Sequence, residues 1–306
     1  MKKPGLLILI IICLIVFFTT LTAGILLTIR VVGPEQLFDP GKLSGRIAEL
    51  TDRFGHINLA PGFGRTLSLD ERKDLDLTDI ESIEIISISE EVRVTTGEQA
   101  YAHLSGTYRT FGSELVWMTE QSGSSMKIYI RYPRFGMVGN HLSLSVQIPA
   151  AYDGMVKINT VSASCDLPDL VDYSWKSLDI HSVSGAIRVA QGDFNQITLV
   201  TVSGKIEIGQ VNGRLTARST SGDIDLSYAV FHLSTISTVS GSVLVELPGD
   251  ADGSFEFTSV SGDFRNEGMP LSQENLQNRK SSGVFGEGGE LLDVNTTSGD
   301  LVLQKR

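Results

Sequence analysis

The sequence predicts an all-β protein, a single-stranded, β-helix-like β-solenoid of about seven coils that is preceded by an N-terminal transmembrane helix. Two observations predict this fold: a Ser-Gly pair that recurs about every 19 residues, and an uncharged apolar run near the N-terminus. The composition agrees, since 306 residues with only 2 Cys cannot form a disulfide scaffold or a multi-cysteine zinc site. A net charge of −11 disfavours a surface that binds nucleic acid.

The apolar run predicts a membrane anchor at residues 5–29. It holds 25 residues without a charge, and as a helix it would be about 37 Å long, enough to cross a hydrocarbon core of about 30 Å. Lys2 and Lys3 precede it, so residues 1–4 should form a cytoplasmic tail and the C-terminal domain should lie outside the cell. A cleaved signal peptide ending near Ala23 is the alternative, which the length of the run disfavours.

Residues 30–74 are predicted to be a juxtamembrane segment. An apolar stripe at helical spacing predicts a short amphipathic helix at 43–54, which either caps the open end of the solenoid or lies against the membrane or a partner. This stripe consists of Leu43, Ile47, Leu50 and Phe54. A stretch rich in Gly and Pro then indicates a linker. Residues 75–155 alternate between apolar and polar, which predicts the N-terminal β-strand region of the solenoid.

Residues 156–306 carry the repeat. The Ser-Gly pairs end in Gly185, Gly204, Gly222, Gly241, Gly262 and Gly299, and Ser162-Ala163 is a degenerate earlier copy. Counted from the serine, position −4 is apolar, position −2 is always Ser or Thr, and position +3 is apolar in every copy. A period near 19 residues is typical of stacked supersecondary units.

The parity of these positions predicts a corner at each Ser-Gly pair. Side chains of a strand alternate between its two faces, so one unbroken strand cannot bury both position −4 and position +3. The chain should therefore bend or bulge near the glycine, which tolerates a positive φ and a close approach of another backbone. We expect each unit to read as strand, corner, strand and turn, and the six glycines to be structural corner residues.

One interval in the repeat is irregular. Ser261 and Ser298 are 37 residues apart, nearly twice the usual spacing, and the segment 268–290 between them is polar and rich in glycine. The sequence leaves open whether this segment is a degenerate coil or a surface loop.

The sequence contains no pattern that predicts catalysis or cofactor binding. The hydroxyl at position −2 recurs in all seven units without an accompanying base, whereas a nucleophile is needed only once. The five histidines are scattered and form no zinc-binding motif, and phosphate-binding and dinucleotide-binding loops are absent. We therefore expect a protein without enzymatic activity, cofactor or metal.

A row of charged residues at position +4 is the candidate binding site. Arg188, Glu207 and Asp225 should stack on the outward side of successive coils, since both neighbours of each are apolar. Equivalent positions of a solenoid form extended surfaces, which suit a polymer or a protein better than a small molecule. The alternative is that these charges only keep the sheet soluble and prevent pairing out of register.

Residues 75–306 resemble the bacterial putative-adhesin family of unknown function. The resemblance lies in the stretches 83–85, 142–149 and 285–289, the Val-Ser-Gly series, and the closing segment 297–301. It implies an exported or membrane-tethered domain of repeated β-strands, loosely linked with adhesion and envelope-stress functions.

These observations lead to one leading function and two alternatives. The first is a single-pass cell-membrane protein whose extracytoplasmic domain is an adhesin-like binding or scaffolding module for an envelope protein or polymer. The second is a sensory or regulatory partner protein in envelope stress, and the third is a carbohydrate-active β-helix enzyme.

Overall fold

The computed structural model describes residues 65–306, apart from 111–112, 133–136, 169, 171–174 and 278. These residues belong to one compact unit of the chain, Gly62–Arg306. They form 21 strands in one hydrogen-bonded sheet, so the prediction of an all-β domain is confirmed. The predicted transmembrane helix 5–29 and amphipathic helix 43–54 lie outside the described residues. Within the described part of the chain, no helix is long and apolar enough to cross a membrane.

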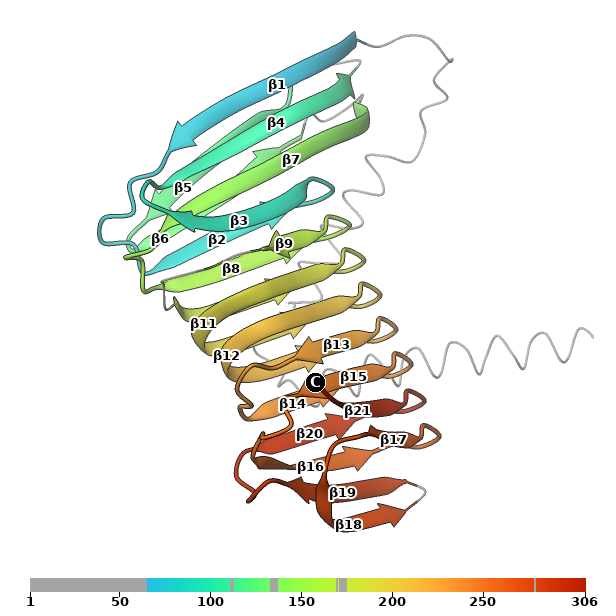
Figure 1. Ribbon diagram of the computed structural model, residues 1–306. Helices are drawn as coiled ribbons and strands as arrows, with labels where there is room; N and C mark the ends of the chain where they lie inside the picture. The colour runs from blue at the N-terminus through green and yellow to red at the C-terminus, as the bar shows by residue number, and fades with distance from the viewer. Residues whose placement is uncertain (1–64, 111–112, 133–136, 169, 171–174, 278) are drawn as a thin grey trace, which may run out of the picture. The chain divides into compact units, whose positions relative to one another are not determined.

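The strands occupy most of the described chain (Figure 1). In chain order they are β1 Arg65–Asp74, β2 Ser82–Ser87, β3 Glu91–Gly97, β4 Tyr101–Thr110, β5 Val116–Ser122, β6 Ser125–Arg131, β7 Met137–Pro149, β8 Met155–Thr160, β9 Cys165–Leu167, β10 Trp175–His181, β11 Ile187–Val200, β12 Ile206–Arg218, β13 Ile224–Ser227, β14 Ser234–Ser237, β15 Val243–Leu247, β16 Gly253–Thr258, β17 Phe264–Glu267, β18 Leu271–Gln277, β19 Lys280–Phe285, β20 Leu291–Asn295 and β21 Leu301–Lys305.

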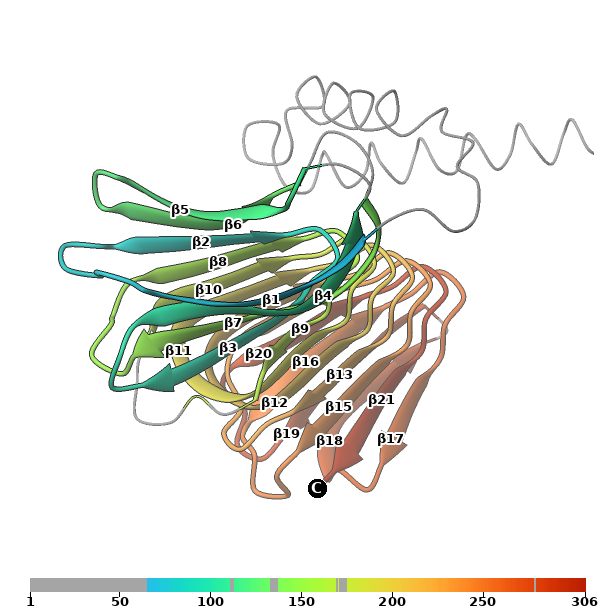
Figure 2. The same ribbon diagram turned by 90° about the horizontal axis from the view of Figure 1, so that it is seen from above.

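The strands are arranged in two layers that meet along a line of corners (Figure 2). The first layer has the order β5-β6-β2-β8-β10-β11-β12-β14-β20-β16-β19-β18. The second layer has the order β1-β4-β7-β3-β9-β11-β12-β13-β15-β21-β17. The long strands β11 and β12 contribute to both layers. We call the two strand segments that flank one corner a rung.

The core is a set of ladders of like residues between the layers. At position −4, Ile158, Ile180 and Leu199 follow one another in register on parallel strands and are fully buried. At position +3, Ile187, Ile206 and Ile224 do the same in the second layer. Each rung therefore buries its apolar residues against its neighbours, as the period predicted.

The burial pattern changes its alternation at the Ser-Gly pair. In the rung of Ser182, this hydroxyl and Gly185 are buried, whereas Val183 and Ser184 between them are both exposed. Because two successive residues face outward, the alternation of inward and outward side chains shifts by one residue at this point. Positions −4 and +3 therefore both face the core. The residue at position −1 is β-branched in every rung, which suits an extended backbone.

The hydroxyls at position −2 hold each corner together. In some corners the hydroxyl donates to the carbonyl oxygen three residues later, as from Ser182 Oγ to Gly185 O at 2.9 Å. In others it accepts from the backbone N–H, as from Gly204 N to Thr201 Oγ1 at 2.9 Å. These bonds satisfy buried polar groups, so the recurring hydroxyls have a structural role.

We expected two reasons for glycine at the corners, a positive φ and the close approach of another backbone, and only the second applies. None of the corner glycines has a positive φ. Instead, each lies against the backbone of the adjacent rung: a Cβ on Gly204 would be 2.0 Å from the carbonyl oxygen of Gly185, and a Cβ on Gly222 would be 1.9 Å from that of Gly204. The close approach of stacked backbones, and not the left-handed conformation, therefore requires glycine here.

The structure contains an eighth rung that the sequence analysis missed. β2 and β3 flank a corner in which Glu90 replaces the glycine, and Ser87 Oγ donates to Glu90 O at 2.8 Å as in the other corners. The Glu90 carboxylate is fully buried and accepts hydrogen bonds from the backbone N–H groups of Ile88 and Ser89 at 3.3 and 3.2 Å. This rung pairs with β8 and β9, where Ala163 occupies the glycine position.

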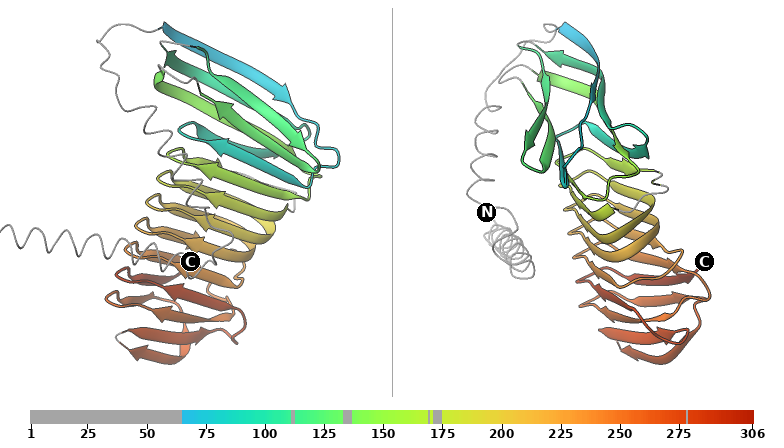
Figure 3. Two further views of the ribbon diagram at one scale, coloured as in Figure 1. Left: turned by 180° about the vertical axis from the view of Figure 1, so that it is seen from behind. Right: turned by 90° about the vertical axis from the view of Figure 1, so that its left-hand side faces the viewer.

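The rungs do not stack in the order of the sequence. The last rung, β20–β21, lies between β14–β15 and β16–β17 (Figure 3). The interval of 37 residues arises because the chain first forms β16–β17 and then the antiparallel hairpin β18–β19, which pairs with β16. Segment 268–290 is therefore mainly a hairpin at one end of the stack, rather than a coil or a loop. At the other end, the pairs β1–β4, β4–β7 and β5–β6 are antiparallel.

Candidate binding face on the second layer

The predicted row lies on the outward side of the second layer. Arg188 pairs in register with Glu207, and Glu207 with Asp225, on the parallel strands β11, β12 and β13. Their flanking residues, such as Ile187 and Val189, point into the core, so alternation turns the three charged side chains outward. The structure thus brings the three predicted residues together on one face.

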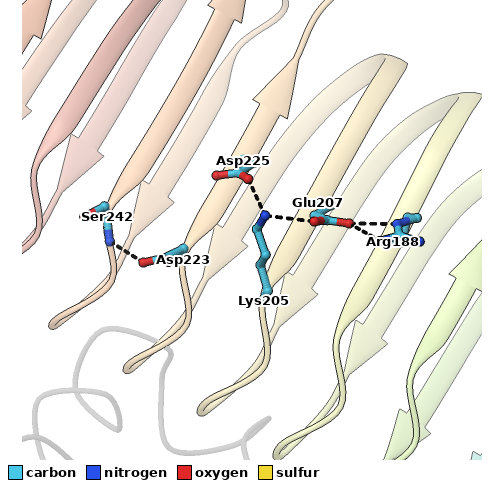
Figure 4. A network of polar contacts seen from close by, with 6 residues as sticks. All are labelled: Arg188, Lys205, Glu207, Asp223, Asp225 and Ser242. Carbon is cyan, nitrogen blue, oxygen red and sulfur yellow. Dashed lines mark hydrogen bonds and ion pairs between the residues drawn. The ribbon is translucent and has the colours of Figure 1, made fainter.

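Ion pairs join the row into one network (Figure 4). Arg188 Nη2 lies 2.6 Å from Glu207 Oε2. Lys205 Nζ lies 2.8 Å from Glu207 Oε1 and 2.6 Å from Asp225 Oδ2. Lys205, which the sequence analysis did not single out, therefore bridges two carboxylates that would otherwise repel each other. It belongs to position +2, and its long side chain reaches the next position because both lie on the same face of the strand.

The network shifts the proton affinities of its members. Hydrogen bonds from Lys205, and then from Arg188, lower the pKa of the Glu207 carboxyl. The same contacts raise the pKa of Lys205 above its ordinary value, with Asp225 as the largest cause. Both shifts favour the charged forms of Glu207 and Lys205. Because the four side chains are at least about one third exposed, solvent screens these ion pairs and they contribute little to stability.

A shallow hollow of about 400 Å³ adjoins the row. Small residues form it, since Ala190, Gly209 and Ser227 stand on three neighbouring strands where longer side chains would fill the space. Glycine is required at 209, because a Cβ there would lie 2.0 Å from the carbonyl oxygen of Ala190. The hollow is also lined by Leu244 and Glu246. It therefore offers charges of both signs beside a partly apolar floor.

On one side the charged row ends at Asp225. Beyond Asp225 the in-register positions are Leu244 and Val302, so the row is interrupted there. Arg265, at the far end, forms a separate ion pair with Asp300, with Nη2 and Oδ2 at 2.5 Å. The aspartates at position +2 have a structural role: Asp223 Oδ1 accepts from the Ser242 N–H at 2.8 Å.

The remaining chemically active side chains do not assemble into a centre. Among the described residues, no group of three or more His, Cys, Asp or Glu side chains could hold a metal ion. His103 Nε2 lies 2.6 Å from Asp70 Oδ1 at an exposed position. Burial lowers the pKa of His181 and raises the pKa of the Cys165 thiol to about 12, which disfavours the reactive thiolate.

Comparisons with solved structures give only distant matches. A putative adhesin from Parabacteroides distasonis is 11% identical with a TM-score of 0.42, and the match covers 79% of this chain and 98% of that one. A putative adhesin from Bacteroides fragilis is 10% identical with a TM-score of 0.42, covering 78% and 97%. A putative lipid binding protein from P. distasonis is 15% identical with a TM-score of 0.41, covering 76% and 96%.

Two comparisons used the sequence. No curated protein matches the chain. Residues 153–304, which hold the seven Ser-Gly and Ser-Ala corners, match the Toastrack DUF4097 family.

Proposed function

We propose that this protein is an adhesin-like binding or scaffolding module of the bacterial cell envelope. In this proposal the rungs form a β-solenoid outside the cell, residues 5–29 anchor it in the cell membrane as a single span, and it has no enzymatic activity. The partner is an envelope protein or polymer, bound at the outward face of the second layer.

The observation that carries the proposal is the ion-pair network beside the hollow. Equivalent residues on neighbouring parallel strands form a row in which successive residues are about 4.8 Å apart. A face of this kind therefore offers repeated contacts to an extended partner. Arg188, Glu207 and Asp225 present both signs of charge, and side chains that are already paired lose little conformational freedom when a partner binds.

Charge reversal on this face tests the proposal. The test variant is Arg188→Glu, Glu207→Lys and Asp225→Lys, made in the full chain and shown to melt like the parent. Its crosslinked partners on intact cells, and its sedimentation with isolated cell envelopes, are compared with those of the parent. The proposal predicts that partners present with the parent are lost.

A matched control exists on the first layer. Lys127, Glu84 and Lys157 also pair in register on the parallel strands β6, β2 and β8, and the ion pair between Lys127 and Glu84 measures 3.8 Å. Reversing these three charges should leave the partners unchanged. If the parent, the test variant and the control give the same partners, binding at the second layer is refuted.

A further inference from the structure

The C-terminal rung occupies a slot between two rungs that precede it in the chain. On one side, β20 pairs with β14 and β21 pairs with β15. On the other side, β20 pairs with β16 and β21 pairs with β17. All these pairings are parallel. Because the rung is hydrogen-bonded on both sides, a slot without residues 291–306 would expose hydrogen-bonding strand edges on both of its sides.

The slot is selective for this repeat. Leu292, Val294 and Leu301 are fully buried between the layers. A Cβ on Gly299 would lie 1.9 Å from the carbonyl oxygen of Gly241, and a Cβ on Gly262 would lie 2.0 Å from that of Gly299. A segment that fills the slot must therefore carry glycine at its corner and apolar residues at the flanking positions, as the C-terminus of this chain does.

The C-terminal rung is also connected in a way that permits exchange. The connection to β19 is the segment 286–290, in which Gly286, Gly288 and Gly289 all have positive φ. Extended, these five residues span at most about 17 Å, and glycine changes conformation at little cost.

We propose that the slot is a strand-acceptor site and that a second copy of this chain fills it with its own residues 291–306. In such a dimer, each copy makes the same hydrogen bonds and core contacts as in the closed monomer, and only the connection 286–290 changes its path. Exchange of an identical element is a low-cost route to a dimer for this reason. The proposal does not depend on the binding face described above.

Cysteine trapping tests this exchange in the full chain. Thr235 on β14 and Asp293 on β20 are in-register neighbours with partly exposed side chains. One chain carries Thr235→Cys and a second, differently tagged chain carries Asp293→Cys, both in a Cys13→Ser background. The native Cys165 is buried and remains. The two chains are produced together, purified in detergent and oxidised mildly.

Exchange predicts a disulfide-linked heterodimer of the two tagged chains. A Thr235→Cys/Asp293→Cys double variant should form an intrachain crosslink, which confirms the register. In the matched control, one chain carries Thr198→Cys and the other carries Thr216→Cys. These residues are in-register neighbours on β11 and β12, which follow one another along the chain. That pair should give several-fold less heterodimer.

Three results would overturn the proposal. The first is an intrachain crosslink in the double variant without any heterodimer from the two single variants. The second is the same yield of heterodimer from the control pair, which would indicate random collision. The third is failure of the double variant to crosslink, because the slot would then not have the register on which the proposal depends.

Discussion

Adding a single methyl group at a corner glycine should disrupt the stack. In Gly204→Ala, the new Cβ would lie 2.0 Å from the carbonyl oxygen of Gly185 and 2.7 Å from its carbonyl carbon. Both are backbone atoms, so no side chain can move aside. To restore an ordinary contact the two rungs must separate by more than about 1 Å from their normal spacing of about 4.8 Å.

This separation breaks specific hydrogen bonds. The adjacent bonds, from Ser203 N to Val183 O at 3.0 Å and from Ile187 N to Lys205 O at 2.9 Å, would become too long. Two lost bonds at about 1 kcal/mol each, with an overpacking cost of about 1–3 kcal/mol, give a loss of about 3–5 kcal/mol in the free energy of unfolding. For a domain of this size, that lowers the melting temperature by about 6–20 °C.

The assay is thermal unfolding followed by far-UV circular dichroism, with two matched glycine variants. In Gly249→Ala the new Cβ would meet only the end of the Lys305 side chain, with Cε at 2.3 Å, and this chain can swing away. We expect a change within about 0.5 kcal/mol. A Cβ on Gly268 would clash with no neighbouring atom, but this residue has a φ of +84°. Gly268→Ala should therefore lower the free energy of unfolding by about 1–3 kcal/mol through backbone strain. Equal shifts for Gly204→Ala and Gly249→Ala would refute the reasoning.

Three further predictions concern side chains. Thr201→Val removes the buried acceptor of the Gly204 N–H and should destabilise the fold by about 1–3 kcal/mol, whereas Thr220→Val, at an exposed position −1, should be neutral; matching denaturant midpoints would contradict this. In a variant without the other cysteine, Cys165 should react with maleimide at pH 8 only after unfolding, because burial raises its pKa to about 12; labelling of the native protein would contradict it. The ion pairs of Glu207 lower its pKa, so their small stabilisation is present above the ordinary carboxyl pKa of about 4.3 and is lost as the pH falls through the folded value. Glu207→Gln should therefore flatten the stability curve in acid, and an unchanged curve would argue against the network.

The local pattern of the sequence predicted the unit of this fold. Position −4 and position +3 have opposite parity, and one regular strand cannot bury both, so a bend or bulge near Gly204 could be inferred without coordinates. The outward direction of Arg188, Glu207 and Asp225 followed from the same alternation. Such inferences succeed because they concern residues a few positions apart.

Contacts between distant residues needed the tertiary structure. The corner at Glu90 lacks the Ser-Gly signature, and only its hydrogen bonds identify it as a rung. Lys205 was overlooked because its role depends on two carboxylates, one on its own strand and one on the next, which it reaches across the face of the sheet. The requirement for glycine at the corners was assigned partly to φ, whereas the distance to the adjacent backbone decides it.

The order of the rungs was decided entirely by the tertiary structure. The repeat determines which positions are equivalent, so the sequence by itself established the rung, its corner and its apolar faces. It did not determine which rungs are neighbours, because every rung presents the same hydrogen-bonding edges and the same apolar ladder to the next. The order of the rungs depends on the parts that do not repeat. The hairpin β18–β19 covers the free edge of β16. The chain then returns, and β20 and β21 lie between two rungs that precede them in the sequence.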